Sequence, residues 1–437
     1  MKSVLFVFGG LVIPAFGQYG GPAVLSRGEA PSAMTSPEIS FRPFLGLGGT
    51  YITGLGGVRI DNNGAVPDAS SFGERVSWGI GGSKSWRHTK VGLDYRGAFS
   101  NYSGAEAQDY INQSLLLGIT QQLSSHVFVS LRENAGIFTR DDLSRGLQQT
   151  VPFDPATTYV PTTDYFDNRT YYTSTQADLR IQKTYRLSFD LGGDVFSVRR
   201  SAKVLYGSTG AVGRGDMQYR VSRFVTIGAG YGYQRYWFSH IYGGTNAHMA
   251  QGTIAVQLSR LVEFSAAVGA ARVESVFAQA VPVPPEIALL LGITSGTRVV
   301  DQVSYHPNTS ARISRTFQHG VLSAFGGQGI TPGNGLFLTS TTSTIGAGYG
   351  YTGLRRWSLN TSATYGFSRS LGYIGGHYRT ANARVSLSRS LIGNIHLVLS
   401  GGLRKYSSPD FDHYNRSTGE ATLGLGWTPG DIPLRVW

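Results

Sequence analysis

Long stretches of the chain alternate, residue by residue, between an apolar side chain and a small or polar one. This is the pattern of a β-strand whose two faces meet different surroundings. Between positions 225 and 234, the odd positions carry Val, Ile, Ala and Tyr, whereas the even positions carry Thr, Gly and Gln. The stretches 171–182, 186–195 and 420–427 divide in the same way. No apolar period of helical length is present from about Phe41 onwards, so the pattern predicts an all-β protein.

The length and spacing of these stretches favour a membrane barrel over a soluble β-sandwich. Stretches of roughly 12 to 16 residues exceed the ~5 to 6 of a soluble strand and meet the ~9 to 11 that a tilted transmembrane strand requires. Short turns, mostly with Ser beside Arg or Lys, recur about 35 to 40 residues apart, which fits two strands per interval. Two intervals near 60 residues contain long segments, about Asp141–Asp167 and Gln279–Asp301.

Short turns on one rim and long loops on the other are typical of outer-membrane barrels. We therefore predict a closed antiparallel transmembrane β-barrel over residues 41–437, with about 18 strands and 16 as the alternative. The turns would be periplasmic and the longer loops extracellular. Closure is required because hydrocarbon offers no partner to the backbone groups of an open strand edge. The 59 glycines suit curved strands with small side chains towards the lumen.

Composition excludes several other classes of protein. Mean hydropathy is −0.10, too low for a helical membrane protein, and the absence of Cys removes disulfides, thiolate metal sites and cysteine nucleophiles. No His, Ser, Asp or Glu spacing matches a nucleophile or metal motif, so we expect no enzyme, no metal site and no cofactor. The net charge of +12 is spread over turns and strands without a basic run, so we expect no nucleic-acid partner.

The N-terminus carries an export signal. Met1–Gly17 joins the basic Lys2 to a short apolar core and a small-x-small site, which predicts a secretory signal peptide cleaved near Gly17. Residues 18–40 are rich in Gly, Pro and Ser and show no period, which predicts a flexible periplasmic leader.

Charged residues on the polar faces of the expected strands are candidates for the pore lining. Rings of charge can orient hydrated solutes in a pore, although the same residues could instead form salt bridges across a filled interior. A barrel of ~16 to 18 strands is too wide for side chains to fill, which favours the pore. A slight basic excess indicates an anion preference. The candidates are Lys90, Asp94, Arg96, Arg132, Asp178, Arg180, Asp190, Asp194, Arg214, Asp216, Arg220, Arg312, Arg384 and Arg404.

The signal peptide, the two-faced strands, the rim asymmetry and the terminal Trp437 resemble porin-type bacterial outer-membrane β-barrel proteins. The resemblance implies a location in the bacterial outer membrane, contact with its lipids, and insertion by the barrel-assembly machinery, which reads a terminal aromatic residue. This chain departs from the pattern because Thr428–Gly430 interrupts the last strand, so Asp431–Trp437 is either a strand or a tail.

The sequence is consistent with two functions. The first is a channel for passive diffusion of small hydrophilic solutes, and the alternative is a non-conducting barrel with a structural or surface-binding role through its long loops. Within the loop 279–301, Glu286–Ile293 begins like a short helix after a Pro-rich stretch. We expect it to fold into the barrel mouth and narrow it, with contact to a neighbouring subunit of a homo-oligomer or to surface polysaccharide as alternatives.

Overall fold

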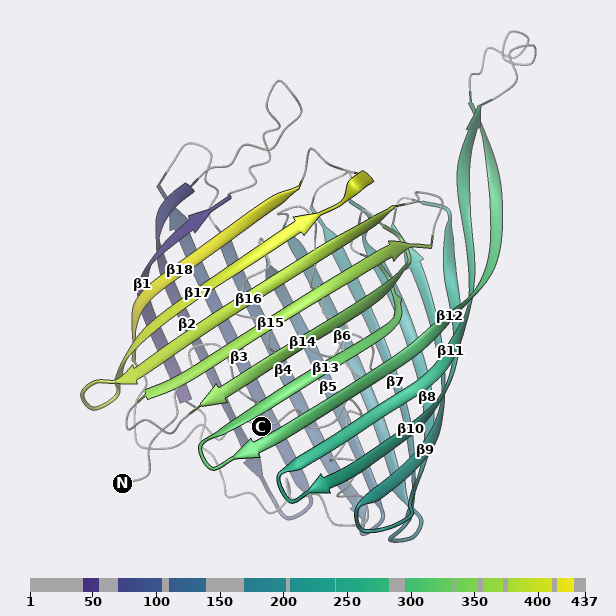
Figure 1. Ribbon diagram of the computed structural model, residues 1–437, viewed down its shortest axis with the longest axis horizontal. Coiled ribbons are helices and arrows are strands. Elements are labelled where there is room, and N and C mark those ends of the chain that lie inside the picture. The colour runs from purple at the N-terminus through teal and green to yellow at the C-terminus, as the bar shows by residue number, and fades with distance from the viewer. Residues whose placement is uncertain are drawn as a thin grey trace.

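The computed structural model describes residues 42–54, 70–103, 110–138, 169–201, 205–239, 241–282, 295–333, 335, 337–351, 357–371, 376–410 and 415–427. These residues form one closed sheet (Figure 1). The predicted signal peptide, the leader and the segment after Trp427 lie outside the described residues. The strands are β1 (Arg42–Thr53), β2 (Ser70–Ser85), β3 (Thr89–Tyr102), β4 (Tyr110–Ser124), β5 (Val127–Phe138), β6 (Thr170–Gln182), β7 (Leu187–Arg200), β8 (Ser208–Arg220), β9 (Val225–Phe238), β10 (Gly243–Ser259), β11 (Val262–Pro282), β12 (Ser295–Phe317), β13 (Gly320–Thr331), β14 (Ser340–Tyr351), β15 (Trp357–Ser370), β16 (His377–Ser390), β17 (Ile395–Ser407) and β18 (Arg416–Trp427).

The sheet is an 18-stranded antiparallel barrel in which each strand pairs with its neighbours in the sequence. Strand β1 pairs with β2 on one side and with β18 on the other, and the second pairing closes the ring. It satisfies the backbone groups that an open edge would leave without partners in hydrocarbon. The predicted fold class is therefore confirmed, with 18 strands and not 16.

The two rims of the barrel differ as the turn spacing indicates. On one rim the strands are joined by short connections such as Ser125–His126, Lys183–Arg186 and Arg260–Leu261 (Figure 1). The connections at the other rim are mostly longer, and the described residues do not cover all of them. By the usual orientation of outer-membrane barrels, the short-turn rim is periplasmic and the long-loop rim is extracellular.

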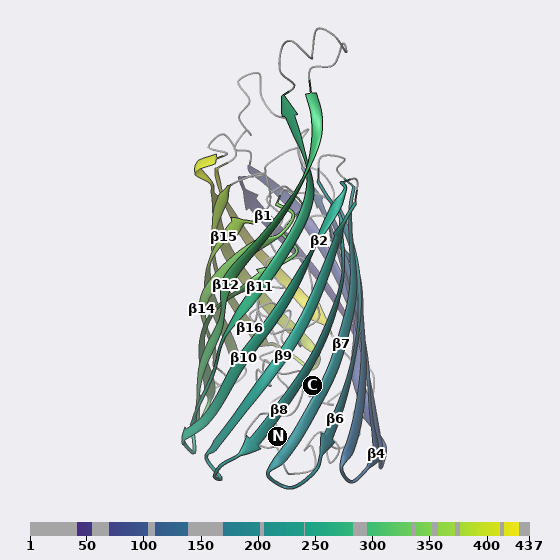
Figure 2. The same cartoon turned by 90° about the vertical axis from the view of Figure 1, so that its right-hand side faces the viewer.

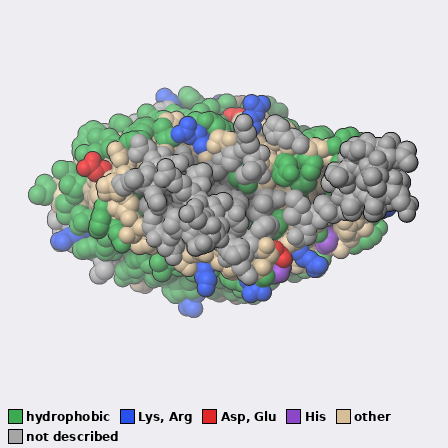
Figure 3. Space-filling view, turned by 90° about the horizontal axis from the view of Figure 1, so that it is seen from above, with side chains coloured by type: hydrophobic (Ala, Val, Ile, Leu, Met, Phe, Trp, Pro, Cys, Tyr) green, Lys and Arg blue, Asp and Glu red, His purple; other side chains and the backbone are tan. Residues whose placement is uncertain are grey.

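The barrel wall carries apolar side chains on its outer face. On β7, Leu191 and Val195 are 50% and 58% exposed, whereas the intervening Asp194 is 3% exposed and points inward. Hydrophobic side chains surround the outline of the barrel seen from above (Figure 3). A soluble protein buries such residues, so this surface suits contact with lipid chains. No helix among the described residues is long and apolar enough to cross a membrane.

Several glycines lie beneath an aromatic ring of the neighbouring strand. A Cβ added to Gly210 on β8 would overlap the ring of Phe196 on β7, and it would lie 2.9 Å from Cδ1 of Tyr236 on β9. Glycine therefore leaves room for both rings, whose centroids are 6.0 Å apart and whose planes are tilted by 53°. The surplus of glycine thus serves packing on the wall, in addition to the curvature expected from the sequence.

Strands β11 and β12 rise well above the rest of the barrel (Figures 1 and 2). They pair with each other from Val262–Arg315 to Pro282–Ser295, but β12 pairs with β13 only between Thr309–Gln328 and Phe317–Gly320. Strand β11 stays paired with β10 up to Phe277, so residues 278–282 and 295–299 form a projecting two-stranded hairpin. Residues 283–294, including the expected helix Glu286–Ile293, lie outside the described residues, and the strands that flank them extend away from the barrel mouth.

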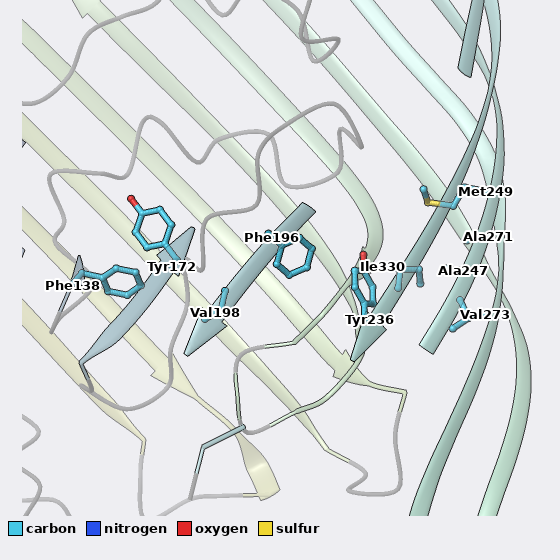
Figure 4. Packing of buried hydrophobic residues seen from close by; sticks show 10 residues of the cluster. All are labelled: Phe138, Tyr172, Phe196, Val198, Tyr236, Ala247, Met249, Ala271, Val273 and Ile330. Atoms are coloured by element: carbon cyan, nitrogen blue, oxygen red, sulfur yellow. The ribbon is translucent and has the colours of Figure 1, made fainter. Parts of the chain in front are cut away.

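A buried apolar cluster lines part of the upper wall. Phe138, Tyr172, Phe196 and Tyr236 come from β5 to β9, and Ile330 comes from β13 (Figure 4). The other members are Val198 on β7, Ala247 and Met249 on β10, and Ala271 and Val273 on β11. The last residue of β13 that pairs with β12 is Gln328, and Ile330 lies beyond it. At this height side-chain packing, and not the β12–β13 backbone ladder, connects β13 to the wall.

Candidate functional site: the charged lumen and its mouth

All of the residues that the sequence indicates as pore-lining lie on strands, at positions that alternate with the exposed apolar positions of the outer wall. They occupy β3 (Lys90, Asp94, Arg96), β5 (Arg132), β6 (Asp178, Arg180), β7 (Asp190, Asp194), β8 (Arg214, Asp216, Arg220), β12 (Arg312), β16 (Arg384) and β17 (Arg404). The side chain of Asp94 is outside the described residues, so only its backbone position is known. These positions put the charges on the inner surface of the wall.

Ion pairs join β6 to β7 and to β8. Arg180 Nε donates to Asp190 Oδ1 at 2.6 Å, and Arg214 Nη2 reaches across β7 to bond Asp178 Oδ1. The second pair passes over Gly192, which is the register partner of both Asp178 and Arg214. A Cβ at Gly192 would lie 2.5 Å from Asp178 Oδ1 and 2.7 Å from Arg214 Cζ. The missing side chain therefore makes room for the salt bridge.

A second polar group lies on the inner face of β16 to β18. Arg404 Nε donates to Asn382 Oδ1 at 2.9 Å, and the guanidinium groups of Arg404 and Arg416 lie 5.6 Å and 5.4 Å from the centroid of the Tyr406 ring. Arg404 is 8% exposed, so it belongs to the packed wall more than to the open surface of the lumen.

Sequence reasoning missed the pair between Arg75 on β2 and Glu420 on β18, whose Nη1 and Oε1 atoms lie 3.3 Å apart. The alternation of Val76, Trp78 and Ile80 with small residues places Arg75 on the inner face and could have found it. It also missed the role of Gly192, which no single-strand pattern indicates. Among the described residues, no group of three or more His, Asp or Glu is placed to hold a metal ion.

The β13–β14 connection (332–339) folds inward across the barrel mouth. The carbonyl oxygen of Gly335 accepts a hydrogen bond from the Tyr206 N–H, between β7 and β8, at 2.9 Å. Phe337 is 1% exposed, and its ring lies 5.6 Å from that of Tyr378 on β16. The β7–β8 end and β16 lie about half-way round the ring from each other. The connection therefore touches opposite walls.

Further contacts hold the β13–β14 connection in place. Thr339 Oγ1 lies 2.7 Å from Thr245 Oγ1 on β10, and its carbonyl oxygen accepts from the Leu371 N–H at 2.8 Å. Gly333 and Gly335 have φ angles of +73° and +88°, a backbone conformation that residues with a side chain rarely adopt. A Cβ at Gly335 would also lie 2.7 Å from Arg200 Nε. The two glycines therefore permit the inward fold.

A closed antiparallel barrel with an apolar outer face, a charged inner face and short turns on one rim is the architecture of porin-type outer-membrane β-barrels. The fold therefore identifies the chain as a bacterial outer-membrane protein.

Comparisons with known proteins find similarity among solved structures of bacterial proteins. No protein-family model and no curated protein sequence matches the chain. Acinetobacter baumannii OccAB4 is 12% identical with a TM-score of 0.41, and the match covers 90% of this chain and 98% of that one. Acinetobacter baumannii OccAB2 is also 12% identical, with a TM-score of 0.42 and coverages of 89% and 98%. Pseudomonas aeruginosa OpdQ is 12% identical, with a TM-score of 0.39 and coverages of 89% and 97%. At these identities, the roles of individual residues rest on this chain's own geometry.

Proposed function

We propose that the protein is an outer-membrane channel for passive diffusion of small hydrophilic solutes. The observation that carries this proposal is the charged inner face of a closed 18-stranded barrel, exemplified by Asp178, Arg180, Asp190 and Arg214. A barrel of this strand number is too wide for side chains to fill its interior. Fixed charges along a water-filled path interact with hydrated solutes, whereas the passage needs no cofactor and no catalytic residue.

We infer that the channel prefers anions, because basic residues outnumber acidic ones on the inner face. Besides the pore-lining candidates named above, inward positions carry Arg75, Arg200 and Arg416, whereas the acidic set gains only Glu263 and Glu420, which the sequence also placed on the polar faces. The carboxylates of Asp178, Asp190 and Glu420 are each paired with a guanidinium, which reduces their attraction for cations.

Conductance of the purified protein in planar bilayers tests the proposal. Discrete open channels are expected, with a reversal potential that favours anions across a KCl gradient. Asp178→Asn together with Asp190→Asn should raise the anion preference, and Arg180→Gln together with Arg214→Gln should lower it. A folded barrel that conducts no ions would refute the channel. A cation-favouring reversal potential would refute the anion preference alone.

A non-conducting barrel that binds at the cell surface is the second candidate, and the part of β12 that is not paired with β13 favours it. On this part, Val299, Val303 and Tyr305 are 55%, 49% and 72% exposed. Apolar side chains so exposed can mark a contact surface. The same bilayer experiment separates the two candidates, because a surface-binding barrel would insert without conducting.

We further propose that residues 1–17 direct export and are removed near Gly17, and that residues 18–40 form a leader in the periplasm. The barrel-assembly machinery would insert the chain among outer-membrane lipids, where it could form a homo-oligomer. Mass spectrometry of the mature N-terminus, and cross-linking in cells, would test these expectations.

A further inference from the structure

Three cationic side chains gather on the outer face of the barrel at its extracellular rim. Arg369 on β15, Arg379 on β16 and Lys405 on β17 are all exposed, and they come from three adjacent strands. They alternate along these strands with inward-facing residues such as Ser368, Thr380 and Arg404, which are all buried. We call Arg369, Arg379 and Lys405 the outer cationic patch.

The strand register brings the members of the outer cationic patch close together. Arg379 is opposite Phe367 on β15, two residues from Arg369, and opposite Ser407 on β17, two residues from Lys405. Each step is thus a diagonal neighbour pair on one face of the sheet, where Cα atoms are ~7 to 8 Å apart and long side chains meet. The three cations therefore form a diagonal row in which Arg379, at the centre, can share an anionic group with Arg369 or with Lys405.

One described carboxylate, Asp410, flanks the outer cationic patch at its Arg369 end. It is held by His377, the register partner of Arg369: the His377 backbone N–H donates to Asp410 Oδ2 at 2.9 Å, and Nδ1 lies 3.4 Å from the same oxygen. The outward positions of β14 to β18 carry no acidic residue in the part of the chain that the structure describes, so the three cations of the patch outnumber this one carboxylate. Arg369 also lies within electrostatic reach of His306 on β12, which adds no negative charge.

An apolar surface continues directly below these charges towards the periplasmic rim. Tyr365 is 46% exposed, Leu403 68%, Val385 50% and Leu399 48%, all on the outer faces of the same three strands. The combination of a row of cations above exposed apolar side chains matches an amphiphile with an anionic head group and acyl chains. The height of the cations, at the extracellular ends of the strands, matches the head-group level of the outer leaflet.

We propose that the outer cationic patch is a binding site for the phosphate head group of an outer-leaflet lipid, whose acyl chains lie over Tyr365, Leu403, Val385 and Leu399. Guanidinium groups bind phosphate by paired hydrogen bonds, and the apolar strip anchors the chains. A second copy of the chain fits this surface less well, because a two-fold interface would bring the same three cations face to face. The site lies outside the lumen and does not depend on conduction.

Native mass spectrometry of the full-length protein in non-ionic detergent provides the test. Phosphatidylglycerol and phosphatidylcholine with identical acyl chains are titrated separately, and glycerol phosphate serves as the head group without chains. The wild-type protein should bind phosphatidylglycerol more tightly than phosphatidylcholine. Each cation removed should weaken phosphatidylglycerol binding by about fivefold, which corresponds to ~1 kcal/mol per Lys or Arg at a membrane surface.

The variants are Arg379→Gln alone and the triple change R369Q/R379Q/K405Q. The matched control is Arg235→Gln, which removes a single outward cation at the same rim that lies 5.0 Å from the Trp237 ring centroid. Folding is checked by the heat-sensitive mobility of barrels in detergent gels, and the single variant suffices if the triple one fails to fold. Loss of the preference in the patch variants, with the control unchanged, supports the site.

Three results would overturn the proposal: an unchanged preference in Arg379→Gln, an equal loss in Arg235→Gln, or glycerol phosphate binding as tightly as the lipid. The last result would indicate a site for a soluble anion. Channel conductance of the patch variants should stay at the wild-type value, because the site lies outside the lumen. Lipid binding is measured without conduction, so a failure of the channel proposal would not affect the lipid-binding test.

Discussion

Arg75 on β2 and Glu420 on β18 form a salt bridge across β1, the strand that closes the barrel. Their Nη1 and Oε1 atoms are 3.3 Å apart, and both side chains are less than one-fifth exposed. In the register of the sheet, Arg75 is opposite Gly48 of β1, and Gly48 is opposite Gly424 of β18. Small residues thus let the two side chains meet over the first strand. The pair therefore supplements the β1–β18 ladder on the lumen side.

Removing the Arg75–Glu420 salt bridge should modestly destabilise the seam between β1 and β18. Arg75→Gln and Glu420→Gln should each lower the free energy of unfolding, and a double-mutant cycle should give a coupling energy of about 1 kcal/mol for such a half-buried pair. Urea titration of the barrel reconstituted in lipid vesicles measures this. A coupling energy indistinguishable from zero would show that the β1–β18 ladder alone holds the seam.

The β13–β14 connection should limit flow through the mouth. Deletion of residues 333–338, with two glycines inserted to join the strands, should raise single-channel conductance because the segment lies between opposite walls of the barrel. Single-channel recording in planar bilayers gives the value directly. The matched control is deletion of residues 283–294 at the β11–β12 hairpin, whose flanking strands extend away from the mouth. If the control raises conductance and deletion of 333–338 does not, the two assignments are reversed.

Glycine beneath an aromatic ring should tolerate no side chain. Gly210→Val should destabilise the barrel by roughly 1 to 3 kcal/mol, because the new Cβ overlaps the Phe196 ring and crowds Tyr236. Gly213→Val on the same strand is the control, since nothing lies within 4 Å of its Cβ position. Unfolding in urea should separate the two variants, and equal stability would contradict the packing described for Gly210.

A charged side chain on the outer wall should destabilise the barrel most when it lies at mid-height. Ile345 on β14 is 64% exposed and lies near the middle of its strand. Ile345→Arg should cost ~2 to 4 kcal/mol of folding free energy in vesicles, whereas Ser417→Arg at the end of β18 should cost only ~0 to 1 kcal/mol, because the cost falls towards the interface. Equal costs at the two positions would contradict the assignment of the lipid-facing belt.

Residue alternation was sufficient to predict the strands, their number and the faces on which Asp178, Asp190 and Arg214 lie, because alternation is a local property. The partners of these charges could not be predicted. Asp178 and Arg180 are two residues apart on one face of β6, but Asp178 pairs with Arg214 on β8 and Arg180 pairs with Asp190 on β7. Which residues meet across strands depends on register, and register is set by the whole ring and by small residues such as Gly192.

The sequence indicated a different segment for the mouth from the one that the structure describes there. The expected helix Glu286–Ile293 in the loop 279–301 lies outside the described residues, and the residues on either side of it extend the β11–β12 ladder from Val276–Asp301 to Pro282–Ser295. The β13–β14 connection is shorter and has no helical pattern. Its inward path depends on positive φ angles at Gly333 and Gly335 and on long-range contacts to Tyr206 and Tyr378. Such contacts leave no periodic trace in a sequence.

Because the β13–β14 connection touches both the β7–β8 end and β16, it braces the barrel across its opening. The free cross-section at that level then depends on the length of one short segment and not on the diameter set by the number of strands. Insertion or deletion of a few residues there could change which molecules enter, while the lipid-facing strands remain unchanged.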